Sequence, residues 1–255
     1  MMEKEERFTE SGTPLPGERY HIEILPDGPY LVYGNPPVQQ EILIQNEEGV
    51  SWEYAKGHSY AATENPTALC RCGHSGKHPY CDGSHARADW DPTLTADNVP
   101  LLEKATIYDG ATLQLSDNPD YCARIRVCMA KHSVWKNTIR SGKPEARETA
   151  IHEAVFCPSG RLKILDKETG EYIEPPLQPE IGLIEDPQKK CSGPLWVKGG
   201  FAVDSPDTAY ERRNRITLCR CGASANKPFC DGTHIDICFN DRLPIPEPEG
   251  KATEA

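Results

Sequence analysis

Apolar and polar residues alternate over several short stretches near both ends of the chain. The alternating apolar positions are Ile22/Ile24, Leu31/Tyr33, Ile42/Ile44 and Trp52/Tyr54 in the N-terminal part, and Trp196, Phe201/Val203 and Ile216/Leu218 in the C-terminal part. A period of two residues, with Gly or Pro between the stretches, is typical of strands that bury one face. The pattern predicts a small antiparallel sheet near each end of the chain.

The middle of the chain has a different pattern. Residues 121–139 and 144–156 have apolar spacings that favour helices, and Pro144 stands where the first turn of the second helix would begin. Residues 161–165 then read as a strand that turns at 168–170. The proline-rich stretch 175–187 reads as a linker.

The two ends of the chain repeat each other. A Gly-Pro pair, at Gly28 and at Gly193, leads in each copy to a Leu-Cys-Arg-Cys-Gly segment. The interval is longer in the first copy, which we interpret as an insertion within residues 46–64. These features divide the chain into a disordered tail (1–18), a first unit (19–95), a ferredoxin-like central domain (96–174), a linker (175–190), a second unit (191–242) and a disordered tail (243–255).

Composition narrows the classes of function. The chain has 255 residues, 23 of them Pro and 20 Gly, and a formal net charge of −11. Because no basic block is present, binding to nucleic acid or to an anionic membrane surface is not expected. The first ten residues lack an apolar stretch, and no segment approaches the roughly 20 apolar residues that span a bilayer. We expect a cytoplasmic protein without a membrane segment.

Eleven cysteines are present, and most stand at short spacings that suit metal ligation better than disulfides. Two segments share the pattern C-x-C-x8-C-D-G-[ST]-H, at residues 70–85 and 219–234. Gly73 and Gly222 directly follow each C-x-C pair and would permit a bend that brings the two thiolates together. The last Cys and the His are four residues apart, so a helical turn would place them on one face, with Asp82 or Asp231 at the N-cap.

Both segments match the motif C-x-C-x2-[ST]-x3-P-x-C-D-G-[SAT]-H of the CDGSH (NEET-type) iron–sulfur family, and the chain resembles a tandem-motif, bacterial-like member. The resemblance implies one 2Fe–2S cluster per motif, with two Cys on the inner iron and Cys plus His on the outer iron. The implied ligands are Cys70, Cys72, Cys81 and His85 for the first cluster, and Cys219, Cys221, Cys230 and His234 for the second.

The alternative is a structural zinc site, since three Cys and one His also form a normal zinc set. With iron–sulfur clusters, His ligation should give a potential between the all-Cys value of about −400 mV and the two-His range of about −150 to +300 mV. Protonation of the histidines would make the potential depend on pH and the clusters acid-labile. His74 and His78 in the first loop are replaced by Ala223 and Lys227 in the second, so the two potentials can differ.

Three central cysteines form a separate pattern, C-x5-C followed by C-P-S-G, at Cys122, Cys128 and Cys157. This pattern resembles the single-cluster 3Fe–4S ferredoxins and the divergent mono-cluster ferredoxin-like domains, which implies a third cluster of the 3Fe–4S or 4Fe–4S type. The alternative is three thiols in a domain that has lost its cluster. Cys191 is a conceivable fourth ligand, and Cys238 reads as an ordinary buried thiol.

We therefore expect an α+β protein in which two small β-rich CDGSH units flank a small α/β ferredoxin-like segment. Family members often pair two single-motif chains, so the two units could pair as a pseudo-dimer within one monomeric chain. The expected function is single-electron transfer or cluster transfer with redox proteins or apo iron–sulfur acceptors, without catalysis on a substrate of its own. The alternatives are a zinc-bearing interaction scaffold and a redox or pH sensor.

Overall fold

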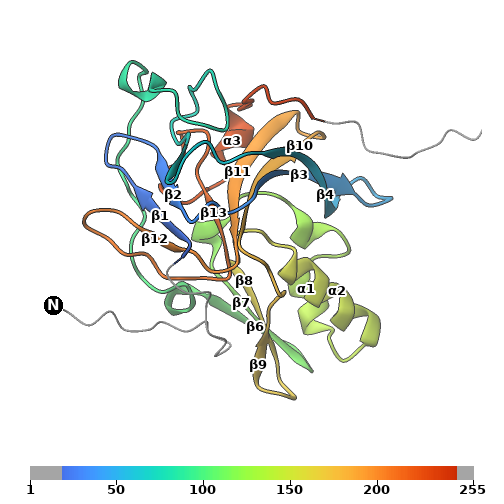
Figure 1. The fold of residues 1–255 in the computed structure, drawn as a ribbon. Coiled ribbons are helices and arrows are strands. Elements are labelled where there is room, and N and C mark those ends of the chain that lie inside the picture. The colour runs from blue at the N-terminus through green and yellow to red at the C-terminus, as the bar shows by residue number, and fades with distance from the viewer. Residues whose placement is uncertain (1–18, 246–255) are drawn as a thin grey trace, which may run out of the picture.

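The computed structural model describes residues 19–245, and its strands form three sheets (Figure 1). The first sheet has the order β12-β1-β2-β5, with β1 His21–Ile24, β2 Tyr30–Tyr33, β5 Thr67–Leu69 and β12 Ala202–Asp204. The second has the order β13-β11-β10-β3-β4, with β3 Val38–Gln45, β4 Ser51–Tyr60, β10 Glu180–Asp186, β11 Cys191–Lys198 and β13 Arg215–Leu218. The third has the order β6-β7-β8-β9, with β6 Thr106–Asp109, β7 Leu113–Asp117, β8 Leu162–Asp166 and β9 Glu171–Ile173.

The helices are short and lie mostly in the central part of the chain. The α-helices are α1 Val134–Ile139, α2 Pro144–Val155 and α3 Thr233–Asp236. The 3₁₀ turns are η1 Ser84–Ala86, η2 Leu101–Lys104, η3 Pro119–Tyr121 and η4 Val127–Met129. None of the helices in the described part of the chain has the length and apolar character that crossing a membrane requires.

The two repeats exchange strands. Strand β12 of the second repeat pairs in parallel with β1 of the first, with Val203 opposite Ile22. Strand β3 of the first repeat pairs in parallel with β10, the strand before the second repeat that also pairs with β11 of that repeat, and Gln40 lies opposite Leu183. Each of the two sheets therefore contains strands from both repeats, and the two units pair within one chain as expected. The prediction of a separate antiparallel sheet near each end is wrong, because the sheets are shared and contain parallel pairs.

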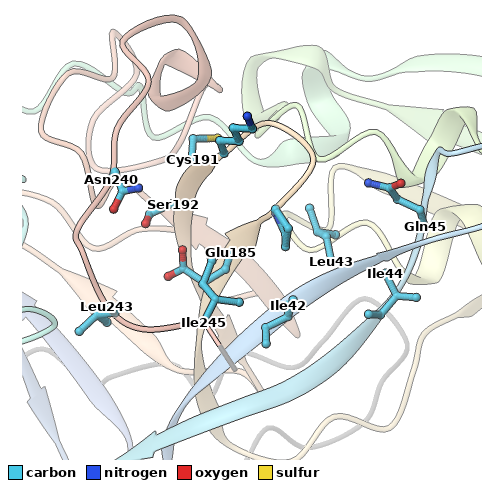
Figure 2. Close-up of a pocket in the computed structure, with 12 residues that line it drawn as sticks. Ile42, Leu43, Ile44, Gln45, Glu185, Cys191, Ser192, Asn240, Leu243 and Ile245 are labelled. Atoms are coloured by element: carbon cyan, nitrogen blue, oxygen red, sulfur yellow. The ribbon is translucent and has the colours of Figure 1, made fainter. Parts of the chain in front are cut away.

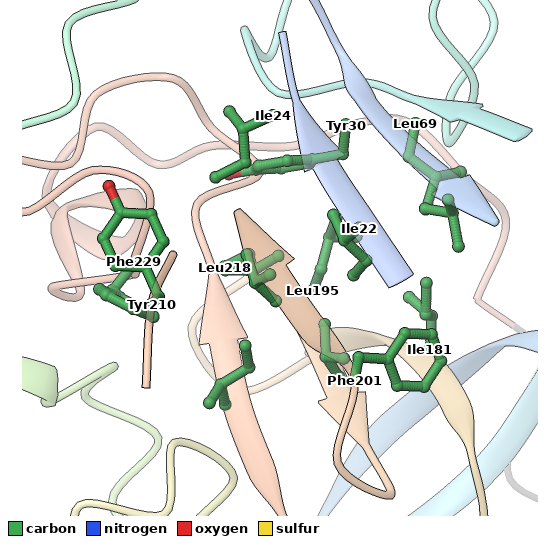
Figure 3. Packing of buried hydrophobic residues seen from close by; sticks show 14 of the residues in the cluster. Ile22, Ile24, Tyr30, Leu69, Ile181, Leu195, Phe201, Tyr210, Leu218 and Phe229 are labelled. Carbon is green, nitrogen blue, oxygen red and sulfur yellow. The ribbon is translucent and has the colours of Figure 1, made fainter. Parts of the chain in front are cut away.

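The exchanged sheets bury one common core (Figure 3). Ile22 and Tyr30 reach it from the first repeat, and Leu195 and Leu218 reach it from the second; each is at most 2% exposed. Because a buried aliphatic side chain contributes about 1.5–3 kcal/mol, this core holds the repeats together as one unit.

The central segment packs on the outer face of the second sheet. Its own sheet, β6 to β9, and helices α1 and α2 surround a second core, which Leu43, Ile184 and Trp196 join from β3, β10 and β11. All eight residues of β11 are buried, whereas β1 buries alternate residues. Strand β11 is thus covered on both faces, and β1 on one.

Most predicted elements are confirmed, including the helix at 144–156, which is α2, and the strand at 161–165, which is β8. The helix predicted over 121–139 is wrong except for α1. Arg124 and Arg126 have φ of 57° and 73°, values that a right-handed helix does not allow, so residues 122–126 form a loop.

The stretch expected to be a linker contains β10, because Ile181, Leu183 and Ile184 supply buried side chains between the prolines. The N-terminal tail 1–18 and residues 246–255 lie outside the described residues. Within the expected C-terminal tail, residues 243–245 carry no helix or strand, and Leu243 packs against the common core.

Candidate metal centres

The four candidate ligands of the first repeat lie on two adjacent loops and form two pairs. Cys70 and Cys72 follow β5, and their sulfur atoms are 3.7 Å apart. The Cys81 sulfur lies 3.3 Å from Nδ1 of His85, which stands in η1. The sequence-predicted ligands are thus brought together, with the imidazole offering Nδ1.

The second repeat reproduces this arrangement. The sulfur atoms of Cys219 and Cys221 are 3.9 Å apart, and the Cys230 sulfur lies 3.4 Å from Nδ1 of His234. Two thiolates on one tetrahedral ion with metal–sulfur bonds of about 2.3 Å would be separated by about 3.8 Å. The spacing within each C-x-C pair therefore suits two thiolates that share one metal atom.

The pairs within each set stay separate from each other. Within residues 19–245, no three Cys, His, Asp or Glu side chains are close enough to surround a single metal ion. Each set therefore presents two donors at one position and two donors at another, rather than four donors around one point.

The Asp of each C-D-G-[ST]-H motif ties the two loops together. The Asp82 carboxylate accepts hydrogen bonds from the amides of Gly76 (2.8 Å) and Ser84 (3.0 Å). Asp231 accepts in the same way from Ala225 (2.8 Å) and Thr233 (2.9 Å). These bonds resemble the expected N-cap, but the N-cap position itself is the following glycine, which has a left-handed backbone in both copies.

The glycine after each C-x-C pair has the expected bend, and it also touches the other repeat. Gly73 and Gly222 both have φ of 78°. A Cβ on Gly73 would lie 2.5 Å from the Cys221 carbonyl oxygen, and one on Gly222 would lie 2.3 Å from that of Cys72. The two cysteine loops therefore meet back to back.

Burial keeps several ligand groups neutral when no metal is bound. Burial raises the pKa of Cys81, and raises that of Cys230 well above its usual value. It lowers the pKa of His234 to about 4. A neutral imidazole is the form that binds a metal, and positive metal charge would favour the thiolates over the thiols.

The central cysteines also converge. Cys122, Cys128 and Cys157 line one small pocket together with residues 123–127 and Arg161. Burial and then the neighbouring Cys157 raise the pKa of Cys128 to about 12. Arg161 forms an ion pair with Asp117 at 2.6 Å, so a buried positive charge is fixed beside the three thiols.

Comparison with protein families assigns all three regions. The model described as "Iron-binding zinc finger CDGSH type" matches residues 27–86 and 192–235, which contain both Cys3His sets. The model described as "Divergent 4Fe-4S mono-cluster" matches residues 108–167, which contain the three central cysteines. The chain therefore carries CDGSH-type and 4Fe–4S-type iron–sulfur regions. Its two CDGSH regions flank the divergent 4Fe–4S region, and no curated protein and no solved structure matches the chain.

The sequence reasoning missed the arginine between the first two cysteines of each CDGSH site. Arg71 and Arg220 are among the largest fully buried side chains. Arg71 donates to four backbone carbonyls, for example that of Gly28 at 2.9 Å. Arg220 instead pairs with Glu185 at 2.9 Å and with Asp241. The one indication in the sequence was that both copies have an arginine between the first two cysteines of the motif.

Two other cysteines differ from expectation. Cys191 begins β11 and lines a different cavity of about 560 Å³, with Leu43 and Asn240 (Figure 2), so it does not join the central set. Cys238, which follows α3, is exposed rather than buried.

The histidines outside the motifs have packing or pairing roles where contacts are seen. His152 stacks between Trp52 and Phe156, with ring centroids 3.7 Å and 4.1 Å away. His21 contacts the carboxylate of Asp204 at 2.9 Å, across the β1–β12 pair of the CDGSH units.

Proposed function

We propose that this protein carries one 2Fe–2S cluster in each Cys3His set and serves in single-electron transfer or cluster transfer between partner proteins. The observation that carries the proposal is the grouping of each ligand set into a Cys–Cys pair and a Cys–His pair. A mononuclear zinc site needs its four donors around one ion. Two pairs of donors suit two metal atoms instead, and when bound such a cluster takes up or releases one electron.

The chain's own residues contribute position, charge and exclusion of water. The six CDGSH thiols and two imidazoles would hold the clusters. The buried guanidinium group of Arg71, which donates to backbone carbonyls, places positive charge at the first C-x-C pair, whereas the charge of Arg220 is balanced by Glu185 and Asp241. Positive charge near a cluster offsets the negative charge gained on reduction. These residues therefore support reversible one-electron chemistry.

The convergence of Cys122, Cys128 and Cys157 supports a third cluster, of the 3Fe–4S or 4Fe–4S type. Arg161 lies beside these thiols and would balance part of the thiolate charge. Three cysteines suit three irons, and a fourth iron would need a ligand from outside this set.

The proposed partners are redox proteins or apo iron–sulfur proteins with a basic docking surface, since the chain has a net charge of −11. Strand exchange between the repeats supports a protein that is complete as a monomer.

Analysis of iron, sulfide and zinc, with electron paramagnetic resonance of the oxidised and reduced protein, tests the proposal. We expect about four irons per chain for two 2Fe–2S clusters and about seven if the central set holds a 3Fe–4S cluster. The variant Cys157→Ser should lower the iron content only by the iron of the central cluster. A colourless protein with about two zinc ions and no sulfide would overturn the proposal in favour of a zinc scaffold.

A further inference from the structure

The two CDGSH turns have the same motif but different surroundings. Cys81 and His85 of the first turn are partly exposed. Cys230 and His234 of the second are only 3% and 1% exposed. The Nε2 atom of His234 is buried and has no hydrogen-bond partner among the described residues. Since the motif is the same, something outside it closes the second turn.

The side chain of Arg124, from the central segment, lies on the second turn. A Cβ added to Gly232 would be 2.2 Å from Cδ of Arg124, whereas one added to Gly83, the matching residue of the first turn, would meet nothing within 4 Å. Nη1 of Arg124 lies 2.6 Å from a carboxylate oxygen of Asp236 at the end of α3. The arginine thus spans the second turn from Gly232 to Asp236.

The rest of the central loop is attached as well. Asn226 of the second cysteine loop donates to the backbone carbonyl of Asp120 at 2.8 Å. Cys230 belongs to the same buried cluster as Ala123, Ile125 and Val127. Arg126 adds an ion pair to Asp186 of β10 at 2.6 Å. Hydrogen bonds, ion pairs and apolar contacts therefore hold residues 120–128 against the second cysteine loop, α3 and β10.

We propose that residues 122–128 act as a cover over the second CDGSH site, so that iron or a whole cluster leaves this protein through the first site. This inference rests on the proposed cluster content. The first site, with an accessible His85, would exchange with an acceptor of iron or clusters. The second site would keep its cluster until the cover opens, and it would remain available for electrons.

The test exposes the purified holoprotein to an excess of a soluble iron chelator and samples it over time. Each sample is treated with iodoacetamide, and the alkylated cysteines are identified by peptide mass spectrometry. We expect labelling at Cys70, Cys72 and Cys81 at least about tenfold faster than at Cys219, Cys221 and Cys230. Parallel labelling of both sets would overturn the cover. Protein that contains no iron at the start would instead overturn the proposed function.

Variants on both sides of the ion pair sharpen the test. Arg124→Ala should accelerate labelling of the second set by about fivefold, and Asp236→Asn by about twofold, because an exposed ion pair contributes little by itself. Arg87→Ala, an exposed arginine beside the first turn, is the matched control and should leave the second set unchanged. If Arg124→Ala and Asp236→Asn both leave the second-set rate at the wild-type value, the cover is wrong.

Discussion

The Tyr30 hydroxyl donates a hydrogen bond to the main-chain carbonyl of Cys219 at 2.9 Å, although the two residues belong to different repeats. The same hydroxyl lies 3.2 Å from the carbonyl of Pro228, so it joins both sides of the second cysteine loop. Tyr30 is fully buried in the common core. One side chain of the first repeat therefore helps to shape the metal site of the second.

Replacing Tyr30 with Phe should weaken the second site more than the first. The change removes the side-chain donor of the buried Cys219 carbonyl, at a cost of about 1–3 kcal/mol, whereas the Pro228 carbonyl still accepts from the Cys219 amide at 2.8 Å. We expect a lower unfolding temperature and faster loss of the second cluster, followed by optical absorbance during heating. Tyr33→Phe is the control, since that hydroxyl bonds only to the exposed-face Glu23 carboxylate. Equal effects of the two changes would contradict this assignment.

Alanine at Gly73 or Gly222 should disturb both cysteine loops, because each glycine touches the opposite loop. We expect a cost of about 1–2 kcal/mol for the left-handed backbone and a further ~1–3 kcal/mol for the contact with a carbonyl. Gly170→Ala measures the backbone cost alone, since Gly170 has φ of 74° and a Cβ there would meet nothing within 4 Å. Iron content and unfolding temperature measure the effect. A Gly73→Ala protein no weaker than Gly170→Ala would argue against loop contact.

Removing the buried positive charge of Lys227 should lower the potential of the second cluster. Lys227 is 6% exposed and donates to the Ser224 carbonyl inside the second cysteine loop. Without this charge the more negative, reduced cluster is less stable, so Lys227→Met should shift the potential down by about 50 mV. Spectroelectrochemical titration measures the shift. Lys77→Met, at an exposed position of the first loop, is the control and should change the potential of the first cluster by much less. An upward shift of the second cluster's potential in Lys227→Met would contradict the prediction.

Glu153 should make the stability of the central segment depend on pH. Burial raises its pKa to about 7, although the Lys131 amide and the Asn137 side chain donate to it. Because the folded state holds the proton more tightly than the unfolded state, this residue's contribution to stability is full at low pH. It is lost as the pH rises from about 4.5 to about 7.

The variant Glu153→Gln removes this titration. We expect the unfolding temperature of the variant, relative to wild type, to rise between about pH 5 and about pH 8. Cluster loss at low pH affects both proteins alike and cancels in the difference. Glu148→Gln, at an exposed position on the same helix, is the control, and its difference in unfolding temperature from wild type should not change with pH. A difference that is also constant for Glu153→Gln would mean that Glu153 is ionised throughout this pH range and would contradict the prediction.

The sequence was sufficient to predict that the Cys and His side chains of each motif lie close together, because the C-x-C and C-D-G-[ST]-H spacings impose local geometry, and both copies show it. It was insufficient where residues distant in sequence decide the outcome. The loop at Arg124 reads as helix by apolar spacing, but its positive φ follows from packing against Gly232, 108 residues away. Strand β10 was hidden between prolines, since its burial depends on partners in β3 and β11.

The asymmetric burial of the two CDGSH sites could not be inferred from motifs that are nearly identical. It arises because the central segment packs on β10 and β11 and leaves β1 and β2 uncovered on that side. Likewise, the spacing of Arg71 and Arg220 indicates nothing about their burial. Their roles depend on Gly28 in one copy and on Glu185 in the other.

The central set and the second CDGSH site should interact magnetically. Cys157 and Cys230 share one hydrophobic cluster. Cys122 also lies close enough to Cys230 to raise its pKa, after the larger effects of burial, Cys219 and Asp231. Two paramagnetic clusters at such short range broaden or split each other's signals. We therefore expect the reduced second cluster to show a broadened electron paramagnetic resonance signal that sharpens in Cys157→Ser. The signal of the first cluster should be the same in wild type and Cys157→Ser. If the central set of the wild type holds its cluster and the signal of the second cluster is equally sharp in wild type and variant, the two clusters do not lie close together.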